Sequence, residues 1–79
     1  MLDTNSVELS LQLKQGLRTF QPEQEQFIDR VILEVDRRRI SRSMVNVVYL
    51  WALRRNPKVP YPYFEIVLKE LAGRKSVQL

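Results

Sequence analysis

Acid–base, nucleophilic and metal chemistry depend on a few kinds of side chain, most of which this chain lacks. Its 79 residues include no histidine and no cysteine, so the commonest general base, the thiol nucleophile and the usual zinc ligands are missing. The two glycines, Gly16 and Gly73, are too few for a phosphate-binding loop. Glu25 and Asp29 are spaced to share one helical turn, as Mg²⁺ ligands can be, but such acids are usually solvated surface. The sequence predicts a protein that is not an enzyme and uses no cofactor or metal.

The distribution of basic residues is more informative than the net charge of +4. From Arg37 to Lys58 there are seven basic residues and no acidic one, whereas the rest of the chain has six basic and nine acidic residues. A positive excess confined to one third of a chain is typical of a surface that binds phosphate or acidic partners. The alternative is a run of solvated charges without a partner.

The elements that carry these residues are predicted from hydrophobic periodicity. From Val7 to Leu13, apolar and polar residues alternate as in a strand, yet the leucines and Phe20 also form a stripe at helical spacing. Leu, Gln, Glu and Lys favour helix, and a lone strand in so short a chain needs a second subunit to pair with. We expect a helix here that ends or bends near Gly16.

The next segment has clearer helical features. Pro22 suits a first helical position, and Glu23 and Glu25 place negative charge in the first turn. Its apolar face is predicted to hold Phe27, Ile28, Val31, Ile32 and Val35. Its polar face is predicted to hold Gln26, Asp29, Arg30, Glu34 and Arg37.

Two further helices follow. Ser41 or Ser43 can cap the third helix, which should run to about Asn56 and stop at Pro57. Residues 56–62, NPKVPYP, predict a stiff extended connector. Pro62 and Glu65 then open a fourth helix that stops at Gly73. Its apolar face is predicted to hold Phe64, Val67, Leu68 and Leu71.

These elements predict one all-α domain over residues 1–79, a compact bundle of three to four short helices in which the third is central. The longest apolar run, from Val47 to Leu53, has seven residues, whereas a membrane span needs about 20. The first residues lack the features of a signal peptide. We therefore expect a cytoplasmic protein without membrane contact.

The third helix divides into two arcs at about 100° per residue. The outer arc is predicted to hold Arg42, Ser43, Asn46 and Tyr49, and the opposite arc Met44, Val45, Val48 and Trp51. Arg42 can bind guanine or phosphate and Asn46 can pair with adenine, while Ser41 and Ser43 can bond either base edges or phosphate. The first two turns of this helix are therefore suited to DNA contact.

Residues 40–51, ISRSMVNVVYLW, resemble the turn and second helix of helix-turn-helix DNA-binding proteins, which often have a small apolar residue, a serine-rich start and paired valines. Ile40 would fill the turn. The sequence departs from the family at Arg39, where glycine is usual, and at Val35, where a small residue is usual. The resemblance implies a small DNA-binding regulator. Its candidate DNA-binding residues are Arg37, Arg38, Arg39, Ser41, Arg42, Ser43, Asn46, Arg54, Arg55 and Lys58.

Ribbon-helix-helix regulators, which are obligate dimers, are a second resemblance. Residues 17–24, LRTFQPEQ, would form the strand, from which Arg18 would enter the groove, and the serine-rich segment would again begin a helix. The chain has an extra helix relative to that family.

A protein partner is the alternative to DNA. Apolar residues surround nearly the whole third helix, which is typical of a buried central helix or of an interface helix. In that case the protein would be an adaptor that buries part of this helix, or the segment from Tyr61 to Phe64, against another protein. A homodimer is compatible with either function. DNA binding is the function that we expect.

Overall fold

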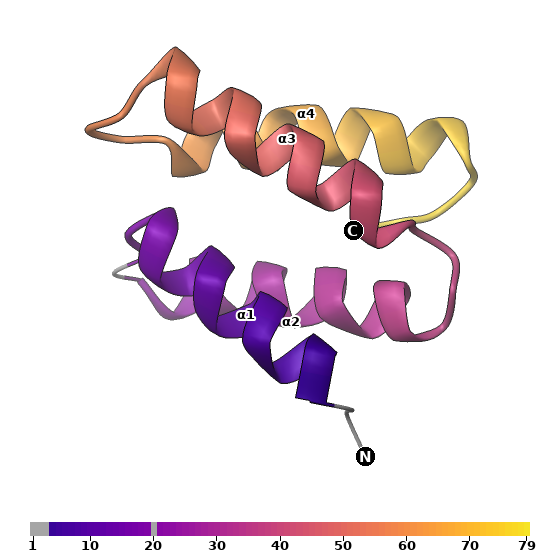
Figure 1. The fold of residues 1–79 in the computed structure, drawn as a ribbon. Helices are drawn as coiled ribbons and strands as arrows, with labels where there is room; N and C mark the ends of the chain where they lie inside the picture. Colours follow the sequence, from indigo (N-terminus) through magenta and orange to yellow (C-terminus); the bar gives the residue numbers. More distant parts are fainter. Residues whose placement is uncertain (1–3, 20) are drawn as a thin grey trace.

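The computed structural model describes residues 4–19 and 21–79 (Figure 1). They form four helices: α1 (Thr4–Gly16), α2 (Pro22–Asp36), α3 (Arg42–Arg55) and α4 (Tyr61–Arg74). The prediction of an all-α bundle is confirmed, and the first segment is helix. Residues 17–19 and 21–24 contain no strand, so the strand implied by the ribbon-helix-helix resemblance is wrong.

The four helices are arranged as two stacked hairpins. α1 packs chiefly against α2, and α3 packs chiefly against α4. The turn between α2 and α3 carries the chain from one hairpin to the other, and the C-terminus returns beside the start of α3 (Figure 1). The apolar faces of the hairpins meet in the middle, which is the two-layer solution open to amphipathic helices.

The starts of α2 and α3 agree with the sequence prediction. Ser41 caps α3 because its Oγ accepts a hydrogen bond from the N–H of Met44 at 3.0 Å. Pro22 occupies the first turn of α2 as predicted. The connector before α4 is a compact turn rather than an extended segment, because Oδ1 of Asn56 accepts the N–H groups of Lys58 and Val59 at 3.2 and 3.0 Å.

Three helices end with a non-glycine residue in the left-handed region: Arg18, Arg38 and Ser76, with φ of 55°, 61° and 61°. After α4, the N–H of Val77 donates to the carbonyl of Ala72 at 2.9 Å, as in a Schellman motif. The predicted stop at Gly73 is wrong, because α4 continues to Arg74 and the left-handed position is Ser76.

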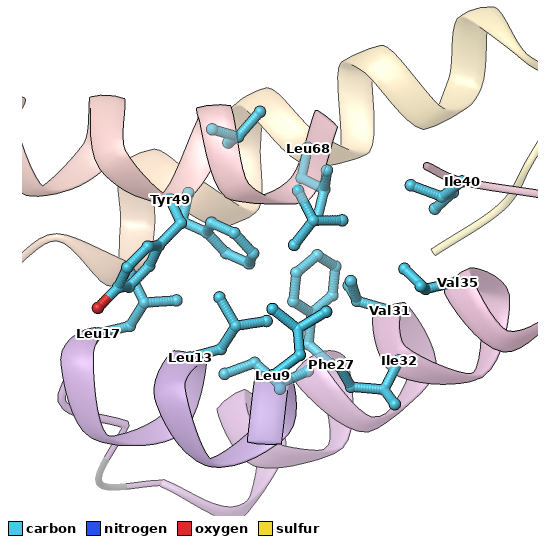
Figure 2. Packing of buried hydrophobic residues seen from close by; sticks show 14 of the residues in the cluster. Leu9, Leu13, Leu17, Phe27, Val31, Ile32, Val35, Ile40, Tyr49 and Leu68 are labelled. Carbon is cyan, nitrogen blue, oxygen red and sulfur yellow. The ribbon is translucent and has the colours of Figure 1, made fainter. Parts of the chain in front are cut away.

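The core lies between the hairpins (Figure 2). Phe27 is at its centre and meets the rings of Tyr61 and Phe64 edge-on, each with a centroid distance of 6.3 Å. Around these rings are packed the buried apolar side chains of all four helices, including Leu9, Leu13, Leu17, Ile28, Val31, Ile32, Val35, Val45, Val48 and Leu68. The predicted apolar face of α2 is confirmed. Phe20, predicted for the same stripe as the α1 leucines, lies outside the described residues.

The buried face of α3 differs from the predicted one. It consists of Val45, Val48, Tyr49 and Ala52. Tyr49, predicted on the outer arc, is 7% exposed, and Trp51, predicted in the core, is 42% exposed. In this orientation the Tyr49 side chain lies against the backbone of Gly16, and Ala52 is fully buried. α3 is therefore not a central, wholly buried helix.

Candidate nucleic-acid interface

Three consecutive arginines lie on the tight turn that ends α2. The helix stops at Asp36, and Arg38 adopts the left-handed conformation at the position that glycine usually takes. The N–H of Arg38 donates to the carbonyl of Val35 at 3.0 Å, and that of Arg39 to the carbonyl of Glu34 at 2.9 Å. These two bonds define a Schellman motif. The turn holds its arginine side chains in solvent and carries the chain directly to Ile40, which is buried as predicted.

Glu34 holds two of these arginines. Its carboxylate lies 3.7 Å from Nη1 of Arg37 and 3.6 Å from Nε of Arg39. The prediction that Glu34 faces solvent is wrong: it is 8% exposed, because the turn folds back over it. Its Oε2 is buried without a hydrogen bond. One carboxylate is shared by two guanidinium groups, so the turn keeps an excess of positive charge.

Basic residues from three segments surround a shallow depression of about 460 Å³ beside this turn. Arg38 and Arg39 come from the turn, Arg42 from the first residue of α3, and Lys75 from the end of α4. Asp36 also lines it. The amino end of α3 contributes the positive end of its helix dipole here, whereas the carboxyl ends of α2 and α4 contribute negative ends, so the positive potential comes from the basic side chains. We call Arg37, Arg38, Arg39, Arg42 and Lys75 the basic end surface.

Lys75 is the residue of this surface that sequence reasoning missed. It is 33 positions from Arg42 in the sequence, and taken alone it is a basic residue at a helix end. The hairpin formed by α3 and α4 places the end of α4 beside the start of α3 (Figure 1). An antiparallel α3–α4 pair, inferred from the short connector between them, is the signal that could have found it.

A second depression, of about 310 Å³, separates the first turns of α3 from α1. Arg42, Ser43 and Asn46 line one side of it, and Glu8 and Gln12 line the other. The exposure predicted for these three α3 residues is confirmed, and Ser41 is exposed as well. Tyr49, the fourth member of the predicted arc, is buried against α1 and cannot reach a ligand in this cleft.

The remaining predicted site residues, Arg54, Arg55 and Lys58, lie at the opposite end of α3. Arg54 is 12 residues from Arg42, which corresponds to about 18 Å along the helix axis and a rotation of about 120°. Arg55 lies over the ring of Tyr63, 5.8 Å from its centroid. The ten predicted residues therefore form two groups, and the structure brings together only the group at the α2–α3 turn.

In the described part of the chain, no helix is long and apolar enough to cross a membrane. Nor do the described residues contain a group of acids that could hold a metal ion. The comparisons with known proteins find no match: no family model, no curated protein and no solved structure is significantly similar to this chain.

Proposed function

We propose that this protein is a small, non-enzymatic DNA-binding protein that contacts the phosphate backbone through its basic end surface. One observation supports this most directly: Arg38, Arg39, Arg42 and Lys75, from three separate segments, line a single depression at the amino end of α3. Like charges repel one another, so a protein gains nothing in stability from gathering them. A polyanion in the depression offsets that repulsion and releases counterions when it binds.

Sequence recognition in this proposal comes from the first turns of α3. Arg42 borders both depressions, while Ser43 and Asn46 lie next to it on the side facing α1. An arginine suits guanine and an asparagine suits adenine, because each can form two hydrogen bonds to a base edge. The likeness of this segment to helix-turn-helix sequences agrees with this arrangement. Glu8, across the cleft, repels phosphate and favours a bound base edge over a second backbone strand.

The proposal is tested by measuring affinity for random-sequence duplex DNA as a function of salt. The basic end surface offers five cations, and the carboxylates of Glu34 and Asp36 lie beside them, so we expect about three phosphate contacts. A plot of log affinity against log salt should then have a slope of about −3. Binding that is absent at low salt, or independent of salt, would rule the proposal out.

A pair of charge-matched variants locates the surface. Arg38→Ala/Lys75→Ala should reduce the salt slope by about 2, because two phosphate contacts are lost. Arg54→Ala/Lys58→Ala removes the same charge at the other end of α3 and should leave the slope unchanged. Equal effects of the two variants would mean that net charge, rather than this surface, determines binding.

A further inference from the structure

The second hairpin exposes an apolar surface that the DNA-binding proposal does not use. Large side chains with 42 to 65% exposure lie on it: Val47, Leu50 and Trp51 on α3, and Ile66 on α4. Exposed apolar patches of this kind mark interaction sites when they are contiguous.

Helical spacing and one ring contact make the surface contiguous. Val47 is one turn from both Leu50 and Trp51, and Ile66 is one turn from Tyr63. Trp51 and Tyr63 join the two helices, with their rings edge-on at a centroid distance of 6.2 Å. We call Val47, Leu50, Trp51, Tyr63 and Ile66 the α3–α4 apolar face.

The charges beside this face determine which partner fits it. Arg54 is one turn from Leu50 and Trp51, and Arg55 is one turn from Trp51. Within the part of the chain that the structure describes, neither arginine has an acidic partner. The acids of α4, by contrast, are already paired: Glu65 with Lys69 at 3.7 Å and Glu70 with Arg74 at 3.1 Å. The face therefore combines exposed apolar groups with two cations that lack a carboxylate.

A second copy of the chain would not supply the carboxylates that Arg54 and Arg55 lack. Residues 42–79 contain seven basic and two acidic residues, a net charge of +5, so two copies joined through this face would repel one another. Nor would the second copy present an unpaired carboxylate of α4 to Arg54 and Arg55. A partner with acidic residues supplies what the face lacks.

We propose that the α3–α4 apolar face docks an acidic amphipathic helix of another protein. The apolar stripe of that helix would cover Val47, Trp51 and Ile66, and carboxylates at one of its ends would pair with Arg54 and Arg55. Helix-in-groove docking of this kind uses apolar anchors at helical spacing, with charges at the rim that select the partner. This face and the basic end surface involve different residues, so the protein would link DNA to an acidic partner. The docking does not depend on DNA binding.

Trp51 provides the test, because it is the single tryptophan of the chain. The probe is a synthetic 18-residue amphipathic helix with leucine and phenylalanine on one face, glutamate elsewhere and no tryptophan. Binding should shift Trp51 emission to the blue and protect it from acrylamide. A matched peptide in which lysine replaces every glutamate should bind at least about tenfold more weakly, because it repels Arg54 and Arg55.

Protein variants then locate the contact. Val47→Ser/Ile66→Ser should abolish protection, whereas Val7→Ser/Leu11→Ser, an equal apolar loss on the exposed side of α1, should not. Arg54→Ala/Arg55→Ala should weaken the acidic peptide about tenfold. Arg38→Ala/Lys75→Ala, the variant that impairs DNA binding in the function proposed above, should leave peptide affinity within about twofold.

Three results would overturn the inference. The first is no protection of Trp51 by the acidic peptide at about millimolar concentration in low salt. The second is equal affinity for the acidic and basic peptides. The third is a dimer in sedimentation equilibrium whose Trp51 is already shielded without peptide, which would show that a second copy covers the face. None of these results bears on DNA affinity, which is measured separately.

Discussion

The ring of Tyr49 lies directly against the backbone of Gly16, where the end of α1 meets the middle of α3. A Cβ atom at Gly16 would lie 2.7 Å from Cζ of Tyr49, closer than such atoms approach in real structures. This contact accompanies the observed rotation of α3. With Tyr49 turned toward α1, Trp51 lies on the outer side, and Arg42 and Asn46 border the cleft beside α1. A glycine in the first hairpin thus helps to determine which residues of the second hairpin face a partner.

Gly16→Ala should therefore destabilise the protein by about 2 kcal/mol, as overpacking of a core typically does, even though alanine is the better helix former. Urea denaturation measures the change. The double-mutant cycle with Tyr49→Leu is the control, since removing the ring should remove most of the penalty at position 16. A Gly16→Ala protein as stable as the parent would show that Tyr49 packs elsewhere.

Trp51→Ala should cost only about 1 to 2 kcal/mol. Trp51 is 42% exposed, so the change removes one edge-on contact with Tyr63 and part of its buried area. The comparison is Phe64→Ala, which empties a fully buried site and should cost about 3 to 5 kcal/mol, enough to unfold so small a domain. Acrylamide should quench Trp51 efficiently in the native protein. Weak quenching of a monomer would contradict the exposed position.

Much of the fold follows from local sequence. The helix starts at Pro22 and Ser41, and the apolar face of α2, are set by proline geometry, side-chain capping and helical periodicity. The orientation of α3 was not predictable in this way, because apolar residues surround the helix and its own pattern does not select a face. The buried contact of Tyr49 with Gly16, a residue of α1, belongs to this orientation. That information is in the tertiary contacts rather than in the α3 sequence.

The candidate site was predictable only as far as its residues are neighbours in sequence. The run of basic residues correctly indicated that arginines gather at the α2–α3 turn. It did not separate them from Arg54 at the other end of the helix, and it could not include Lys75, which arrives from α4. The number of charges along a sequence does not say on which side of the fold each charge lies. The helix rotation and the hairpin topology determine which charges share a surface.

Stability should fall at alkaline pH because of Tyr61. Burial raises the pKa of the Tyr61 hydroxyl well above its ordinary value, and so does its hydrogen bond to Oε1 of Glu65 at 3.0 Å. Above pH of about 10, the unfolded chain releases this proton while the folded chain keeps it, so the free energy of unfolding decreases. Below that pH the contribution is constant. The difference in urea midpoint between the parent and Tyr61→Phe, from pH 8 to 11, isolates the effect from lysine titration. It should change only above about pH 10, and a constant difference would contradict the prediction.

Arg38→Gly should stabilise the protein by about 0.5 to 1 kcal/mol, because glycine adopts the left-handed conformation without strain. It should also weaken DNA binding through the loss of one phosphate contact.

Two control variants separate these effects. Arg18→Gly, at the equivalent position after α1, should stabilise the protein by a similar amount without changing its DNA affinity. Arg38→Ala removes the same charge but keeps the strain, so its stability should stay near that of the parent. Thermal melting and salt-dependent binding, measured on all three variants, test whether the arginine is retained for function at a cost in stability.

Glu34→Gln should strengthen DNA binding. The carboxylate of Glu34 is shared by Arg37 and Arg39, and its ion-pair distances of 3.7 and 3.6 Å indicate attraction without a hydrogen bond. The amide keeps the size of the side chain but removes the charge, so both guanidinium groups become available to phosphate. We expect a salt slope steeper by about 1 and an affinity several-fold higher at moderate salt. Stability should change by less than about 1 kcal/mol, because both arginines are more than half exposed and keep their hydration.

The control is Glu23→Gln, which removes the same charge at the opposite end of α2 and should leave the salt slope unchanged. If both variants raise affinity equally, long-range net charge explains the effect. If Glu34→Gln has no effect, Arg37 and Arg39 do not contact DNA.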